Sequence, residues 1–189
     1  MDAFLISTGL VAIAEIGDKT MLLAICLAAT WRKPAPILLG ILVATLLNHA
    51  LAAGFGALLG AWLAGPWVKW VLGLAFLGFA VWALIPDGFD DCPPEDRAKS
   101  AWGVFAATAV AFFLVEMGDK TQVATAALGA RFPAEVAVVA AGTTLGMMIA
   151  NGPAVFLGEA AAERLPLVWI RRAAAVGFAA TGVWILVAG

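Results

Sequence analysis

Long apolar runs, divided by short polar interruptions, occupy almost the whole chain. A helix of about 20 apolar residues can cross a bilayer, and proline, glycine and charged positions mark where such helices start and stop. The pattern predicts six helices, at about residues 3–29, 35–62, 67–85, 100–129, 134–160 and 167–187. We therefore predict an all-α integral membrane protein with six transmembrane helices.

The composition supports a single membrane domain. Of the 189 residues, 63% are hydrophobic and 13% are charged, whereas soluble domains are roughly half apolar and a quarter charged. We expect residues 1–85 to form a first three-helix unit, residues 86–99 an acidic linker, and residues 100–189 a second three-helix unit. The net charge of −2 gives no indication of a nucleic-acid partner. The expected partner is the lipid bilayer, and the oligomeric state stays open.

Basic residues in the loops favour one orientation in the cell's inner (plasma) membrane. One side would carry Arg32, Lys33, Arg97, Lys99, Arg164, Arg171 and Arg172. The other side would carry only Lys69 and Arg131. Because Lys and Arg are enriched in cytoplasmic loops, we expect a cytoplasmic linker and both termini outside.

The two halves of the chain repeat one another. EIGDKT at residues 15–20 returns as EMGDKT at residues 116–121, and Asn48 corresponds to Asn151. Further matched pairs at a nearly constant offset are Gly56 with Gly158, Trp67 with Trp169, Phe76 with Phe178 and Trp82 with Trp184. Since each half has an odd number of helices, the second half should enter the bilayer from the opposite face. Two inverted three-helix repeats are typical of secondary transporters, with the substrate near the midplane.

The repeated motif places acids inside apolar runs. On a continuous helix, residues three apart share a face, so we expect one carboxylate pair per half, formed by Glu15 with Asp18 and by Glu116 with Asp119. Lys19 and Lys120 could pair with the glutamates of their own helix or reach the other repeat. Gly17 and Gly118 could allow close approach of a neighbouring helix or local unwinding.

The charges of the two motifs favour a divalent cation as substrate. Four carboxylates and two ammonium groups leave a charge of −2, and each unpaired charge at a helix centre costs roughly 2.5–3.5 kcal/mol. Carboxylate, hydroxyl and amide oxygens suit hard cations such as Ca²⁺, Mg²⁺ and Mn²⁺. The predicted metal ligands are Glu15, Asp18, Glu116, Asp119, Asn48, Asn151 and Gln122, with Gly17, Lys19, Thr20, Gly118, Lys120 and Thr121 as motif partners and His49 as an additional candidate.

The same acids suggest exchange of the metal for protons. Carboxylates gathered in a low-dielectric site cannot all stay charged when the metal is absent, so some should bind protons. We therefore predict an antiporter that works by alternating access, with Mn²⁺ or Ca²⁺ as transported substrate and no resident cofactor.

Other interpretations stay open at this point. The Glu–Lys spacings fit intrahelical ion pairs, the asparagines fit interhelical hydrogen bonds, and His49 fits a structural histidine or a proton relay. A second functional class is an exporter of amino acids or other small organic cations. An intramembrane hydrolase is disfavoured, because no serine or cysteine lies beside a base in the sequence, and we expect a protein that is not an enzyme.

The paired E-x-G-D-K-T motif, one copy in each half, resembles that of the Gdt-type cation antiporter family. This family is also called the transmembrane protein 165 family; it lies in the lysine-exporter superfamily and includes bacterial MneA-type manganese exporters. The resemblance implies export of Mn²⁺, and in some members Ca²⁺, in exchange for protons or another cation. It also implies that the four motif acids bind the metal. Gln often follows the family motif, as Gln122 does here, but Met21 follows the first copy.

Overall fold

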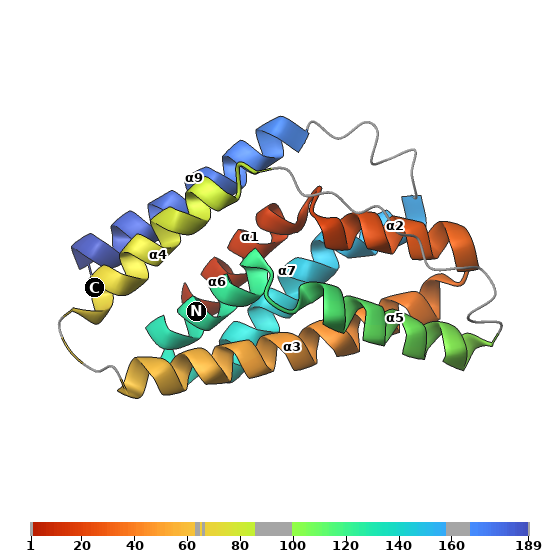
Figure 1. Cartoon of the computed structure of the whole chain (residues 1–189), viewed down its shortest axis with the longest axis horizontal. Helices are drawn as coiled ribbons and strands as arrows, with labels where there is room; N and C mark the ends of the chain where they lie inside the picture. The colour runs from red at the N-terminus through yellow and green to blue at the C-terminus, as the bar shows by residue number, and fades with distance from the viewer. Residues whose placement is uncertain (1, 63–64, 66, 86–99, 158–166, 189) are drawn as a thin grey trace.

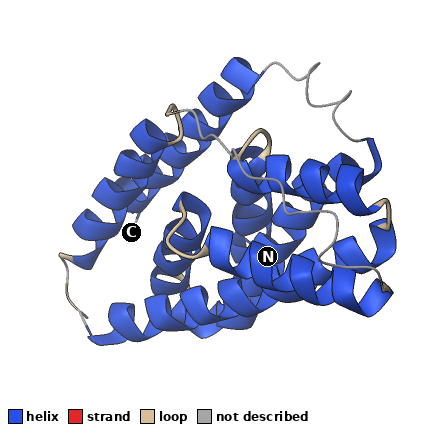
Figure 2. Cartoon of the chain, turned by 45° about the vertical axis from the view of Figure 1, so that its right-hand side comes forward, coloured by secondary structure: helices blue, strands red, loops and turns tan. Residues whose placement is uncertain are grey.

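The computed structural model describes residues 2–62, 65, 67–85, 100–157 and 167–188, and all regular structure within these ranges is helical (Figures 1 and 2). The elements are α1 (Asp2–Glu15), α2 (Lys19–Trp31), α3 (Pro34–Trp62), α4 (Val68–Trp82), α5 (Ala101–Glu116), α6 (Lys120–Arg131), the 3₁₀ turn η2 (Pro133–Glu135), α7 (Val136–Leu157) and α9 (Leu167–Ala188). The predicted linker and Gly158 lie outside the described residues.

Two of the six predicted helices are broken. The predicted helix at 3–29 is the pair α1 and α2, and the predicted helix at 100–129 is the pair α5 and α6. The second pair bends by 72° at its break. Apolar periodicity gave no warning of these breaks, because each short motif fits inside a run long enough to form one continuous helix.

Span length supports a multi-pass membrane protein. Within the described ranges, three segments are long and apolar enough to cross a bilayer alone: Pro34–Trp62, Pro133–Leu157 and Val168–Val187. The bent pair α5–α6 makes a fourth if it counts as one span. Large side chains such as Leu58 and Val187 are 72% and 80% exposed, which suits a surface that faces lipid.

Helices from different halves pack together. α7 packs on α1 and α2, α3 packs on α5 and α6, and α4 packs along α9 (Figure 1). Between α4 and α9, the matched residues Phe76 and Phe178 are both buried, with ring centroids 6.3 Å apart. Each half therefore supplies the helix that covers the broken pair of the other half.

Candidate cation-binding site

Both motif copies lie at the breaks rather than within continuous helices. Glu15 is the last residue of α1, and Asp18 is the N-cap of α2, where its side chain accepts a hydrogen bond from Lys19 N at 2.7 Å. Between them Gly17 has a φ of 81°, a left-handed conformation that glycine adopts without strain. The expectation that Glu15 and Asp18 share a face of one helix is therefore wrong.

The second copy repeats this local structure. Glu116 ends α5, Gly118 has a φ of 79°, and Asp119 is the N-cap of α6. In both copies the aspartate N–H returns to the glutamate carbonyl, at 3.0 Å for Asp18 and 3.1 Å for Asp119. The glycines thus serve as turn residues, and a Cβ added at Gly118 would meet no heavy atom within 4 Å. Local unwinding, not close helix approach, explains Gly118.

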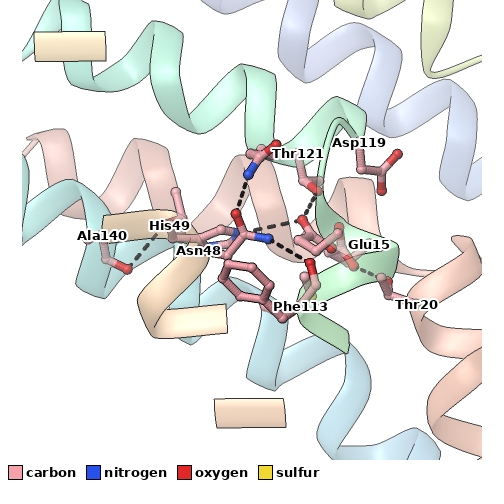
Figure 3. Close-up of polar contacts among 12 residues, drawn as sticks. Glu15, Thr20, Asn48, His49, Phe113, Asp119, Thr121 and Ala140 are labelled. Atoms are coloured by element: carbon pink, nitrogen blue, oxygen red, sulfur yellow. Dashed lines mark hydrogen bonds and ion pairs between the residues drawn. The ribbon is translucent and has the colours of Figure 1, made fainter. Parts of the chain in front are cut away.

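The breaks bring acids from both halves together. One ligand oxygen from each of Glu15, Asp18 and Asp119 lies within 4.8 Å of the others, and all three residues are buried. We call these three residues the acidic triad. In Figure 3, Asp119 lies on the turn between α5 and α6, and Glu15 lies close to this turn. The triad thus combines two acids of the first motif with one of the second.

Glu116 lies beside the triad and contacts the single histidine. Its Oε1 is 3.5 Å from Nε2 of His49 on α3, and both side chains are fully or almost fully buried. Gly152 corresponds to His49 in the second half. The site is therefore asymmetric in its nitrogen donor.

Hydroxyl groups orient the two glutamates. Thr20 Oγ1 donates to Glu15, and Thr121 Oγ1 donates to Glu116 (Figure 3). Both threonines lie in the first turn after the break. The matched bonds hold each glutamate at the end of its helix, and the other carboxylate oxygen of each is buried without a hydrogen-bond partner among the described residues.

The lysines connect the two halves. Lys19 Nζ lies 3.3 Å from Asp119 Oδ1, and Lys120 Nζ lies 3.1 Å from Asp18 Oδ2. Each lysine therefore pairs with the aspartate of the other motif copy, one of the two arrangements that the sequence left open. These crossed pairs compensate the negative charges of the two aspartates.

A side chain in the first turn after each break accepts a hydrogen bond from the glycine N–H group. Gln122 Oε1 accepts from Gly118 N at 2.6 Å, and its amide donates to Asn48 Oδ1. In the first copy Met21 Sδ lies 3.2 Å from Gly17 N. Gln122 and Met21 thus play matched roles. This role of Met21 was not expected from the sequence, because a thioether is a weaker acceptor than an amide oxygen.

The two matched asparagines differ in their hydrogen bonds. Asn48 Nδ2 donates to Phe113 O at 3.4 Å on α5, so Asn48 bridges two helices (Figure 3). Asn151 Nδ2 donates to Met147 O at 3.2 Å within α7, and its Oδ1 is buried without a hydrogen-bond partner among the described residues. The Asn151 oxygen therefore keeps unused acceptor capacity, whereas the Asn48 oxygen accepts from Gln122.

Several buried acceptors lack donors. Within the part of the chain that the structure describes, Glu15 Oε1, Glu116 Oε2 and Asp119 Oδ2 have no hydrogen-bond partner. Buried polar atoms normally find a partner, and ionised carboxylate oxygens can only accept. A cation or protons would satisfy these atoms. The set of carboxylate oxygens therefore suits binding of a hard metal ion.

The chain is similar to known proteins over most of its length. A family model described as "Divalent cation/proton antiporter GDT1" matches residues 3–91 and 104–189, one segment in each half. A curated protein from Vibrio cholerae serotype O1, named "Putative manganese exporter", is 47% identical over 175 residues, which cover 93% of this chain and 86% of that protein. No solved structure matches the chain.

Proposed function

Since this chain belongs to the GDT1 family of divalent cation/proton antiporters, we propose that it exports Mn²⁺ from the cell in exchange for protons. The observation that carries the proposal is the acidic triad, in which Glu15, Asp18 and Asp119 place ligand oxygens within 4.8 Å of one another. Manganese as substrate is supported by the name of the relative and by the buried imidazole of His49, since imidazole suits transition metals better than Ca²⁺.

The charge of the site links the two transported ions. The four motif acids and two lysines carry a formal charge of −2. One divalent cation or two protons would each bring this charge to zero, and a neutral site is the least costly to keep in low dielectric. We therefore propose that metal and protons occupy the acids in turn, which couples their movements in opposite directions.

The crossed lysines fit this exchange. Lys19 and Lys120 compensate Asp119 and Asp18. A metal in the triad would take over that compensation, and each lysine would weaken its contact with the opposite half. We propose that this loss of cross-contact lets the two halves move relative to one another, so that the site opens to one side at a time.

Membrane topology completes the proposal. Counting α1–α2 and α5–α6 as one broken crossing each, together with α3, α4, α7 and α9, gives six crossings in two inverted repeats. The matched breaks and the crossed packing of the halves support this count. We also propose the inner membrane as location, with the linker cytoplasmic and both termini outside, from the bias of basic loop residues.

The direct test is Mn²⁺ flux into proteoliposomes under an imposed pH gradient. The intact chain should accumulate Mn²⁺ when the gradient drives protons outward, while Glu15→Gln, Asp18→Asn and Asp119→Asn should lose at least about tenfold in initial rate. That factor corresponds to loss of about 1.4 kcal/mol, less than the cost of removing one partner from a buried charged cluster.

Glu135→Gln is the matched control, because Glu135 is a carboxylate in η2 outside the triad. It should transport at the rate of the intact chain. Full flux by the triad variants would disprove the site, and flux that ignores the pH gradient would disprove proton exchange.

A further inference from the structure

A cavity separate from the acidic site opens where the termini of three helices meet. It has a volume of about 220 Å³ and lies between the start of α4, the end of α6 and the end of α9. In Figure 1 the start of α4 and the end of α9 lie together at the left of the molecule, near the label C. Lys69 and Arg131 contribute cations to its lining, and Val68, Leu72 and Ile185 contribute apolar walls. None of the described residues that line it is acidic.

Arg131 is held in place with part of its hydrogen-bonding capacity unused. Its guanidinium lies over the rings of Trp184 and Phe132, at 5.0 and 5.4 Å from their centroids. Such cation–π contacts position the charge but do not saturate the donors of the planar fork. Within the described residues, Arg131 Nε is buried without a hydrogen-bond partner. Because Arg131 lines the cavity, its other N–H groups can donate to a ligand with acceptor oxygens there.

Tryptophans mark the depth of this cavity in a bilayer. Trp62, at the end of α3, is 81% exposed, and Trp67 and Trp70, at the start of α4, are 47% and 55% exposed. Exposed tryptophans gather at the level of lipid headgroups. The cavity therefore sits where a headgroup meets its acyl chains.

We propose that this cavity binds an anionic phospholipid, with the headgroup phosphate on Arg131 and Lys69 and an acyl chain along Leu72 and Ile185. Arginine suits phosphate because its planar fork can donate two parallel hydrogen bonds. An acyl chain of a lipid would pack against the apolar walls, whereas free phosphate would make no favourable contact with them. The bound lipid joins the second arm of a broken helix, α6, to the α4–α9 pair.

Native mass spectrometry of the purified full chain in detergent tests this proposal. Phosphatidylglycerol should bind at a saturable single site, more tightly than phosphatidylcholine, and inorganic phosphate should not displace it. Because each variant removes one charge-assisted contact with the phosphate, Arg131→Gln and Lys69→Gln should each weaken phosphatidylglycerol binding roughly fivefold, which corresponds to about 1 kcal/mol.

Two further variants separate the site from general charge and from folding. Arg172 also lies over a tryptophan, at 4.9 Å from the ring of Trp169, but does not line the cavity, so Arg172→Gln should keep the affinity. Leu72→Trp keeps both cations but fills the cavity, and should lose the tight site. Equal binding of the two lipids, equal weakening by Arg172→Gln, full binding by Leu72→Trp, or displacement by phosphate would each overturn the proposal.

Discussion

Gly17 and Gly118 determine where the two broken helices stop. Their positive φ values turn the backbone between the glutamate that ends one helix and the aspartate that starts the next. A residue with a Cβ pays about 1–2 kcal/mol in this conformation, even where there is space for the side chain. The motif therefore needs glycine at this position for its backbone, and the acids need the turn in order to meet.

Gly118→Ala should reveal this backbone requirement. A Cβ at Gly118 would meet no heavy atom within 4 Å, so the expected destabilisation of roughly 1–2 kcal/mol comes from φ alone. Thermal unfolding in detergent should show a lower midpoint for Gly118→Ala, together with reduced Mn²⁺ flux. Gly78→Ala is the control, since Gly78 lies inside α4 with equally open surroundings, and alanine there should stabilise slightly. A midpoint unchanged in Gly118→Ala would refute the argument.

At this scale the sequence supplied the acids but not their geometry. The motif singled out Glu15, Asp18 and Asp119 because acids are costly in apolar runs. It left open whether the helix continues or unwinds at Gly17 and Gly118, since an apolar run of that length fits a continuous helix as well as two short ones. One signal was present: a glycine followed by aspartate is a common helix stop and N-cap. The crossed lysine pairs needed tertiary structure.

The contact between α3 and α6 depends on two reciprocal glycines. A Cβ at Gly56 would lie 1.8 Å from Ala126 O, and a Cβ at Gly129 would lie 2.2 Å from Ala53 O. Small residues let membrane helices approach to backbone contact. This approach also places Asn48 on α3 within hydrogen-bond reach of Gln122 on α6. Gly56 and Gly129 therefore serve as packing surfaces, and the sequence alone could not say which helices they join.

Gly56→Ala should therefore force α3 and α6 apart. Overpacking of this kind costs roughly 1–3 kcal/mol, so we expect a lower unfolding midpoint and slower Mn²⁺ flux, because α6 carries part of the site. Gly54→Ala is the matched control on the same helix, since a Cβ there meets nothing within 4 Å. If both variants unfolded at the same temperature as the intact chain, the close contact would not matter for stability.

The two halves are interlocked across the whole molecule. α7 covers the broken pair α1–α2, while α3 covers the broken pair α5–α6. The duplication and the six apolar runs were predictable from periodicity and self-similarity, and the family model matches the halves separately. The exchange of covering helices was not predictable, because every apolar face in the sequence suits several neighbours equally well.

Separate expression of the halves tests this interlocking. Residues 1–85 alone and residues 100–189 alone should be degraded, because each leaves a broken pair uncovered and its motif charges unpaired. Their co-expression should restore stable protein and Mn²⁺ resistance in cells that lack an exporter of their own. An intact chain cleaved within residues 86–99 is the positive control. A single half that accumulated and transported Mn²⁺ would contradict the interlocked arrangement.

Because each lysine pairs with the aspartate of the other half, a substitution in one copy of the motif also changes the charge balance of the other copy. Removing the ammonium group of Lys19 takes a cation away from Asp119, and removing that of Lys120 takes one away from Asp18, so the loss of a lysine in one half leaves a surplus negative charge in the other half. A second change that restores the stability lost with a lysine should accordingly lie about a hundred residues away, at the partner aspartate, but it should not restore flux, because that aspartate belongs to the triad.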